Sequence, residues 1–363
     1  MSSPSNGMRS VVSTQSVDVH VGPVRRWMIV GGSTALVWAT YGLLASNGIF
    51  LSYWSANQLA GLPNSTTSWI NGVHLFLNWS LTFPIGIVFD KRGSNMLLFV
   101  GSAFYLAGIF GMAESSRFWQ FMVTYGILGG AGSAILSTVA ISVLGHWFDK
   151  RKGLATGIVI LGGSLGGVVF PLALRPMFEM IGWSWSIRAL GFFITILIGL
   201  GLFSVRSRAP AIHTQPVAIR AVLRPTFLFA TLGIGAFDFV LFGALGLLPE
   251  FGESLNLTEA TGYLLVAIVN ACSAVGRIAA GMLADVIGPF NAIISVMLVG
   301  LISMLAFWLQ SSYSEVLLYL FAVLFGLSSG GALSLEPLCI GQLCHASHFG
   351  QYYGTCFLFV AAM

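Results

Sequence analysis

Three ionisable side chains lie deep within apolar segments of this 363-residue chain: Asp238, Arg277 and Glu336. A charge at such a position costs about 2.5–3.5 kcal/mol in a membrane, so it usually faces a partner or a cavity. A guanidinium can hold a carboxylate through two parallel hydrogen bonds. We therefore interpret Arg277 as a contact for an anionic ligand. The alternative is that it reaches the membrane interface or braces the loop at Asp285, two helical turns away.

The two acids are candidates for reversible proton binding. A carboxyl group held away from water takes up a proton more readily than one in water. Asp238 and Glu336 could therefore each carry a proton. The alternative for Asp238 is a fixed bond to a polar group on another helix. The alternative for Glu336 is a structural role beside Pro337, where a helix has free carbonyl groups.

Uncharged polar residues extend this candidate site. Asn71, His74, Asn78 and Thr82 are spaced 3, 4 and 4 residues apart, which places them on one face of a helix. Such a stripe could line a cavity or make hydrogen bonds between helices. Asn270 lies seven residues before Arg277 and shares its helical face. The candidate ligand contacts, besides Arg277, are Tyr41, Asn47, His74, Asn78 and Asn270.

The composition identifies the elements that must position these residues. The chain is 56% hydrophobic and 8% charged, whereas soluble domains carry about 25% charged residues. Apolar segments long enough to span a bilayer as helices recur along it, and the alternating pattern of a β-barrel is absent. The predicted fold is therefore an all-α membrane protein. The predicted spans are 27–53, 69–89, 95–113, 118–146, 153–178, 185–205, 225–250, 260–284, 289–309 and 315–340.

An eleventh apolar segment begins near Gln351, and we expect it to be truncated at Met363. We expect 1–26 to be a disordered cytoplasmic tail, 27–205 one helical half, 206–224 a cytoplasmic linker and 225–363 the second half.

With the N-terminus inside, 12 of the 16 Lys and Arg residues fall on the cytoplasmic side. The glycosylation sequons at Asn64 and Asn256 then fall on the opposite side, whereas a third at Asn78 lies within a helix.

A short loop occurs twice, 195 residues apart, in the pattern G-x-x-x-D-x-x-G. A repeat at about half the length of a helical membrane protein points to two related halves. We expect its two aspartates to face helix N-termini, where negative charge is favoured, and its glycines to permit tight turns. The predicted gating residues are Gly86, Asp90, Arg92, Gly93, Arg151, Gly281, Asp285 and Gly288.

These loops resemble a signature of the major facilitator superfamily. The stretch from His146 to Gly157, followed by Gly162 to Pro171, is similar to a signature of the monocarboxylate transporter family, especially its fungal branch. The resemblance implies a major facilitator fold: two pseudo-symmetric six-helix halves around a central substrate cavity. Arg277 matches an arginine of that family. Position 273, where animal members carry an aspartate, is Ser273 here, and the first helix lacks their lysine.

The sequence predicts a secondary transporter that moves a small organic anion, such as a monocarboxylate, by alternating access with proton symport. One alternative is export of an amphipathic metabolite or drug by proton antiport. A second is a non-transporting membrane sensor or scaffold. We expect no enzyme activity, cofactor, metal site or nucleic-acid partner, since no metal-ligand cluster, nucleophile–base pair or nucleotide-binding loop is visible. We expect the protein to lie in the lipid bilayer of the plasma membrane, with the vacuolar membrane as the alternative.

Overall fold

The computed structural model describes residues 23–148, 151–206, 224–255, 259–311, 314–345 and 348–362. The regular structure in these ranges is helical. Nine helical stretches within them are long and apolar enough to cross a membrane. The elements are α1 (Pro23–Leu44), α2 (Asn47–Ala56), α3 (Asn64–Ser80), α4 (Thr82–Arg92), α5 (Ser94–Ala113), α6 (Phe118–Phe121), the π-helix η1 (Met122–Gly129), α7 (Gly130–Ser142), α8 (Leu144–Trp147), α9 (Lys152–Ser204), α11 (Pro225–Ser254), α12 (Glu259–Ile287), α13 (Pro289–Ile302), the π-helix η2 (Ser303–Trp308), α14 (Glu315–Gln342) and α15 (Phe349–Ala362).

The predicted span 27–53 is interrupted rather than continuous. A turn at residues 45–46 separates α1 from α2. The Ser46 hydroxyl donates to the Gly42 carbonyl at 2.8 Å and lies 3.3 Å from the Gly166 carbonyl of α9. A serine hydroxyl that bonds backward to the preceding turn bends a helix, which a hydrophobicity pattern does not reveal.

The longest helix, α9, contains two predicted spans. Its 53 residues would measure roughly 80 Å as a straight helix, far more than the ~30 Å of a bilayer core. Gly182 breaks it with φ 75° and ψ 173°. A backbone with positive φ favours glycine, which has no Cβ. The break lies between the predicted spans 153–178 and 185–205 and lets the chain reverse direction.

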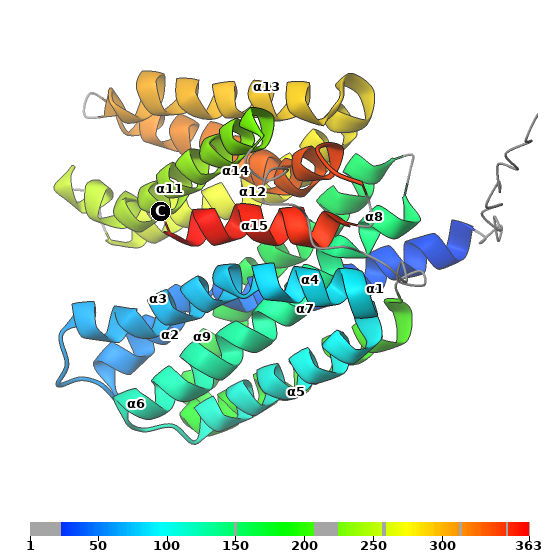
Figure 1. Ribbon diagram of the computed structural model, residues 1–363. Coiled ribbons are helices and arrows are strands. Elements are labelled where there is room, and N and C mark those ends of the chain that lie inside the picture. The colour runs from blue at the N-terminus through cyan, green and yellow to red at the C-terminus, as the bar shows by residue number, and fades with distance from the viewer. Residues whose placement is uncertain are drawn as a thin grey trace, which may run out of the picture.

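The helices form two groups (Figure 1). Helices α1 to α9 form one group and α11 to α15 the other, and α15 lies on the side of its group that faces the first, beside α4 and α11. The first group buries one large apolar core, and the second buries two smaller ones. A further cluster joins α15 to α11 and α7 across the division. Each group therefore packs mainly around its own core.

The two groups touch closely at one end through pairs of glycines. A Cβ added to Gly86 on α4 would collide with the Gly350 carbonyl oxygen on α15. The related pair is Gly153 on α9 and Gly281 on α12, where a Cβ on either would collide with the other's carbonyl oxygen. Small residues allow such close approach of helix backbones. The contact lies at the end that carries the doubled loops.

Candidate functional site

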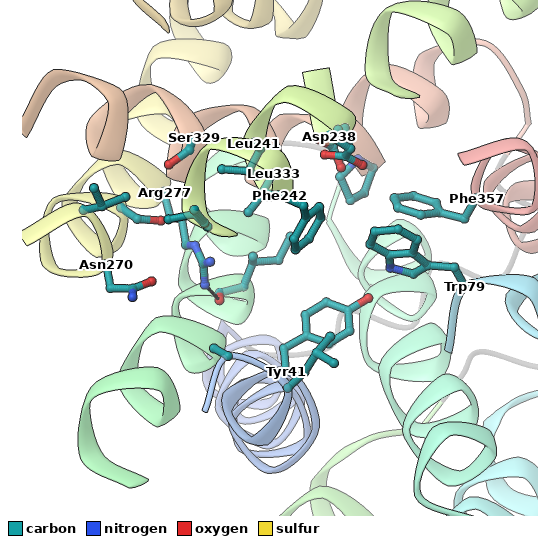
Figure 2. Close-up of a pocket in the computed structure, with 18 of the residues that line it drawn as sticks. Tyr41, Trp79, Asp238, Leu241, Phe242, Asn270, Arg277, Ser329, Leu333 and Phe357 are labelled. Carbon is teal, nitrogen blue, oxygen red and sulfur yellow. Dashed lines mark hydrogen bonds between the residues drawn. The ribbon is translucent and has the colours of Figure 1, made fainter. Parts of the chain in front are cut away.

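A cavity of about 250 Å³ lies between the two groups of helices. Its walls come from α1, α3, α7 and α9 on one side and α11, α12, α14 and α15 on the other. Figure 2 shows Arg277 and Asn270 at one side of this space, and Trp79 and Phe357 at the other. The cavity thus has a polar side and an aromatic side, and it joins residues far apart in sequence.

Arg277 lies in the cavity wall and is buried there. Its side chain is 9% exposed, and one of its terminal N–H groups donates to the Ile160 carbonyl oxygen of α9. Its Nε has no hydrogen-bond partner among the described residues. Glycines of α9 leave room for it, since a Cβ on Gly163 would lie 3.1 Å from Nη1. A buried guanidinium with unused donors is suited to binding an anion.

Asp238 and Glu336 line the same cavity. Their exposed fractions are 2% and 1%. Both carboxyl oxygens of Asp238 and the Oε1 of Glu336 lack a hydrogen-bond partner in the described chain. Buried carboxylates without partners are energetically costly, so this part of the cavity favours a bound cation or proton.

An aromatic wall completes the cavity; we use this name for Trp79, Phe242, Tyr353 and Phe357. Trp79 contacts Phe242 edge-on with 5.3 Å between ring centroids, and the rings of Tyr353 and Phe357 lie 4.7 Å apart. Tyr41 also lines the cavity and interacts electrostatically with Glu336 and Asp238. The aromatic wall can pack against an apolar ring.

Three of the predicted ligand contacts lie elsewhere. His74, Asn78 and Asn47 are not among the residues that line this cavity. His74 is fully buried, with its Nδ1 2.9 Å from the Tyr125 carbonyl oxygen, and Asn47 accepts a bond from the Tyr125 hydroxyl. The polar stripe of α3 therefore turns toward the interior of the first helical group. Tyr41, Asn270 and Arg277 do reach the cavity.

The two repeated aspartates make matching contacts between the helical groups. Asp90 accepts hydrogen bonds from the backbone N–H groups of Gly350 (3.2 Å) and Gln351 (3.0 Å) at the start of α15. Asp285 accepts them from Gly153 (2.8 Å) and Leu154 (2.9 Å) at the start of α9. Each carboxylate thus meets the positive end of a helix in the other group.

The other predicted loop residues surround these contacts. Gly93 and Gly288 have φ values of 77° and 88°, as expected for tight turns after each aspartate. Arg151 has φ 58° and directly precedes α9. An Arg92 terminal nitrogen lies 3.6 Å from the Met96 sulfur. Asn64 is exposed at the start of α3, and Asn256 lies outside the described residues.

The aromatic wall is the part of the site that sequence reasoning missed. None of its four residues is among the ligand contacts predicted from the sequence. One signal was available: Phe242 follows Asp238 by four residues, and Phe357 follows Tyr353 by four, so each pair shares a helical face. For Trp79 we find no comparable signal.

Comparison with known proteins identifies relatives over most of the chain. The sequence model of the Major Facilitator Superfamily matches residues 27–363. The riboflavin transporter of Saccharomyces cerevisiae is 31% identical over 364 residues, covering 93% of this chain and 70% of the relative. The fujikurins efflux protein of Gibberella fujikuroi is 30% identical, covering 94% and 74%. The aspyridones efflux protein of Emericella nidulans is 28% identical, covering 92% and 68%.

Solved structures share the fold. The human organic anion transporter MFSD10 superimposes with a TM-score of 0.70 at 15% identity, over 94% of this chain and 91% of that one. The transporter FucP in its outward conformation superimposes with a TM-score of 0.66 at 16% identity, over 92% and 89%.

Proposed function

We propose a substrate and a coupling mode for this chain, which belongs to the major facilitator superfamily and is a multi-pass membrane transporter. The substrate is a small organic anion with an apolar body. Arg277 binds the negative group, and the aromatic wall packs against the body. Uptake is coupled to protons through Asp238 and Glu336.

One observation carries this proposal: a buried guanidinium with an unpaired Nε in the cavity wall. The protein supplies a backbone carbonyl to Arg277, and no ion pair involves it among the described residues. A positive charge in that setting gains strongly from an anionic ligand. The volume of about 250 Å³ is near the lower end of ligand pockets, roughly 300–1,000 Å³, which favours a small molecule.

The aromatic wall supports a ring-containing substrate over a short monocarboxylate such as lactate. It also supports the second candidate function, export of an amphipathic metabolite. Relatives named as efflux proteins and as a riboflavin transporter are consistent with such substrates. The two candidates share the binding chemistry and differ in the direction in which the proton gradient drives the substrate.

Transport would proceed by alternating access, in which one helical group rocks against the other. The contacts of Asp90 and Asp285 would hold one end closed and break when that end opens. Because the basic loops surround this end, we assign it to the cytoplasm. We propose the plasma membrane as the location, with the vacuolar membrane as the alternative.

Counterflow in proteoliposomes containing the full chain tests the substrate class. Labelled benzoate, lactate and riboflavin serve as an aromatic anion, a short anion and a planar uncharged molecule. We expect saturable benzoate counterflow that Arg277→Gln weakens about 10- to 100-fold, which corresponds to the ~1.5–3 kcal/mol of a hydrogen bond to a charged group. Arg277→Lys should weaken it less, since it retains the charge.

Arg175→Gln is the matched control, because Arg175 lies exposed on α9 and away from the cavity. Riboflavin transport that Arg277→Gln leaves unchanged, with no benzoate transport, would exclude an anionic substrate. Accumulation of benzoate inside the vesicles while an outward-directed proton gradient is imposed would favour the export candidate, because antiport exchanges the two and symport would carry both outward.

A further inference from the structure

The carboxyl groups of Asp238 on α11 and Glu336 on α14 face each other within hydrogen-bonding reach. An ionised carboxylate can only accept a hydrogen bond, so two of them cannot bond to each other. A single proton between them supplies the missing donor. One unpartnered oxygen of each residue is then satisfied by the other.

The alternative charge state is unfavourable. Two ionised carboxylates in direct contact repel, and burial removes the water that would screen them. Both side chains are at least 98% buried, and no described side chain donates a hydrogen bond to the Asp238 oxygens. The pair therefore requires a proton or another cation.

The groups around the pair determine how many protons balance it. Tyr41 from α1, Arg277 from α12, Cys339 from α14, and Tyr353 and Cys356 from α15 interact electrostatically with one or both acids. Tyrosine hydroxyls and cysteine thiols are neutral near pH 7, so the arginine supplies the positive charge. Two carboxylates and one guanidinium have a net charge of −1, and one shared proton brings it to zero.

We propose that Asp238 and Glu336 form a single proton-binding site that holds one shared proton when the cavity is empty. The next step rests on the proposed function. An anion bound at Arg277 neutralises the positive charge of the guanidinium, so the pair of acids binds a second proton. That proton comes from water on the open side and returns to water on the other side. One proton then accompanies each monovalent anion.

Infrared spectroscopy of the purified full chain, without any substrate, tests the shared proton. We expect a carbonyl-stretch band of a protonated carboxyl group that disappears as pH rises, and that Asp238→Asn and Glu336→Gln each remove completely. Two independent sites would instead leave about half of the band in each variant, which would overturn the proposal. Glu315→Gln is the matched control, because Glu315 is an exposed acid at the start of the same helix α14.

A double variant controls for the case in which the single variants lose the band because they do not fold. Asp238→Glu combined with Glu336→Asp exchanges the two acids, keeps the pair and should restore the band. Failure of this variant to restore the band in a folded chain would count against a pair. Loss of the band on adding sodium at constant pH would show a metal-cation site and would also overturn the proposal.

The second proton is measured separately, with a pH dye in weakly buffered solution. Benzoate binding should take up one proton per anion, and the double variant Asp238→Asn with Glu336→Gln, which leaves no acid to bind it, should show no uptake. Benzoate binding without proton uptake would overturn the coupling while leaving the proposed substrate class intact. Absence of benzoate binding, with the infrared band present, would instead contradict the proposed function and leave the shared proton standing.

Discussion

Arg277 owes its position to residues that carry no chemistry themselves. A Cβ on Gly157 would collide with the Arg277 carbonyl oxygen, and one on Gly163 would lie 3.0 Å from Tyr41 Cβ as well as against the guanidinium. Arg277 itself is visible in the sequence as a charge within an apolar segment. The glycines that make room for it stand on another helix, more than 100 residues away.

The aromatic wall leads to a prediction about substrate choice. Trp79→Leu should weaken benzoate binding about 2- to 12-fold, the equivalent of ~0.5–1.5 kcal/mol for an aromatic contact. Binding of acetate should change little, since it has no ring to pack. Titration calorimetry of both anions against the purified chain measures the difference.

Trp119→Leu is the control for that experiment, because Trp119 is 59% exposed and away from the cavity. Equal weakening of acetate and benzoate by Trp79→Leu would contradict a contact with the ring.

At the scale of elements, the break in α9 depends on one backbone conformation. Gly182 and Gly199 both lie in open space, with no atom within 4 Å of an added Cβ, but Gly182 alone of the two has positive φ. Gly182→Ala should therefore destabilise the protein by ~1–3 kcal/mol through backbone strain. Gly199→Ala should be neutral or stabilising by up to ~1 kcal/mol, because alanine favours a helix.

Thermal unfolding of the two variants in the same detergent measures this contrast. Equal midpoints for Gly182→Ala and Gly199→Ala would exclude a strained turn at Gly182.

At the scale of the molecule, the doubled loops join the two helical groups. Asp90 is 4% exposed, whereas Asp285 is exposed to solvent. Solvent weakens charge interactions, so the Asp90 contact should be the stronger of the two. The second loop also lacks the basic residues Lys91 and Arg92 that follow Asp90 in the first.

Cys344 provides a natural reporter for opening at this end. Burial raises the pKa of its thiol to about 12, with the Lys152 ammonium opposing this shift and the Asp90 carboxylate adding to it. Opening would hydrate the thiol and return its pKa toward the ordinary ~8.5, so a larger fraction would be the reactive thiolate. Labelling by maleimide at constant pH should therefore become faster when the end opens.

Asp90→Asn should raise the labelling rate of Cys344 about tenfold or more, since it weakens a hydrogen bond to a charged group worth ~1.5–3 kcal/mol. Asp285→Asn should raise it less, and Glu315→Gln should leave it unchanged. Mass spectrometry of the labelled chain quantifies the rate at Cys344. A larger effect of Asp285→Asn than of Asp90→Asn would contradict the order inferred from burial.

Much of the fold follows from the sequence because it depends on local properties. Apolar length predicts most of the helical segments, and the duplicated loop predicts two aspartates that face helix N-termini. The same local reasoning finds the two acids and Arg277, since charge in an apolar segment is visible without a structure. The break of α1 at Ser46 was missed, because a hydrophobicity pattern does not reveal where a serine hydroxyl bonds back to the preceding turn.

Only the tertiary structure decided which faces of these helices meet at the cavity. The polar stripe of α3 is evident from its spacing, but the rotation of α3 against its neighbours turns His74 toward Tyr125 and Trp79 toward Phe242. The proposed pairing of Asp238 with Glu336 likewise joins two helices about 100 residues apart. The sequence by itself determined the helices and their charges. The packing between helices determined the site, because the rotation of one helix against another is a property of all its neighbours together.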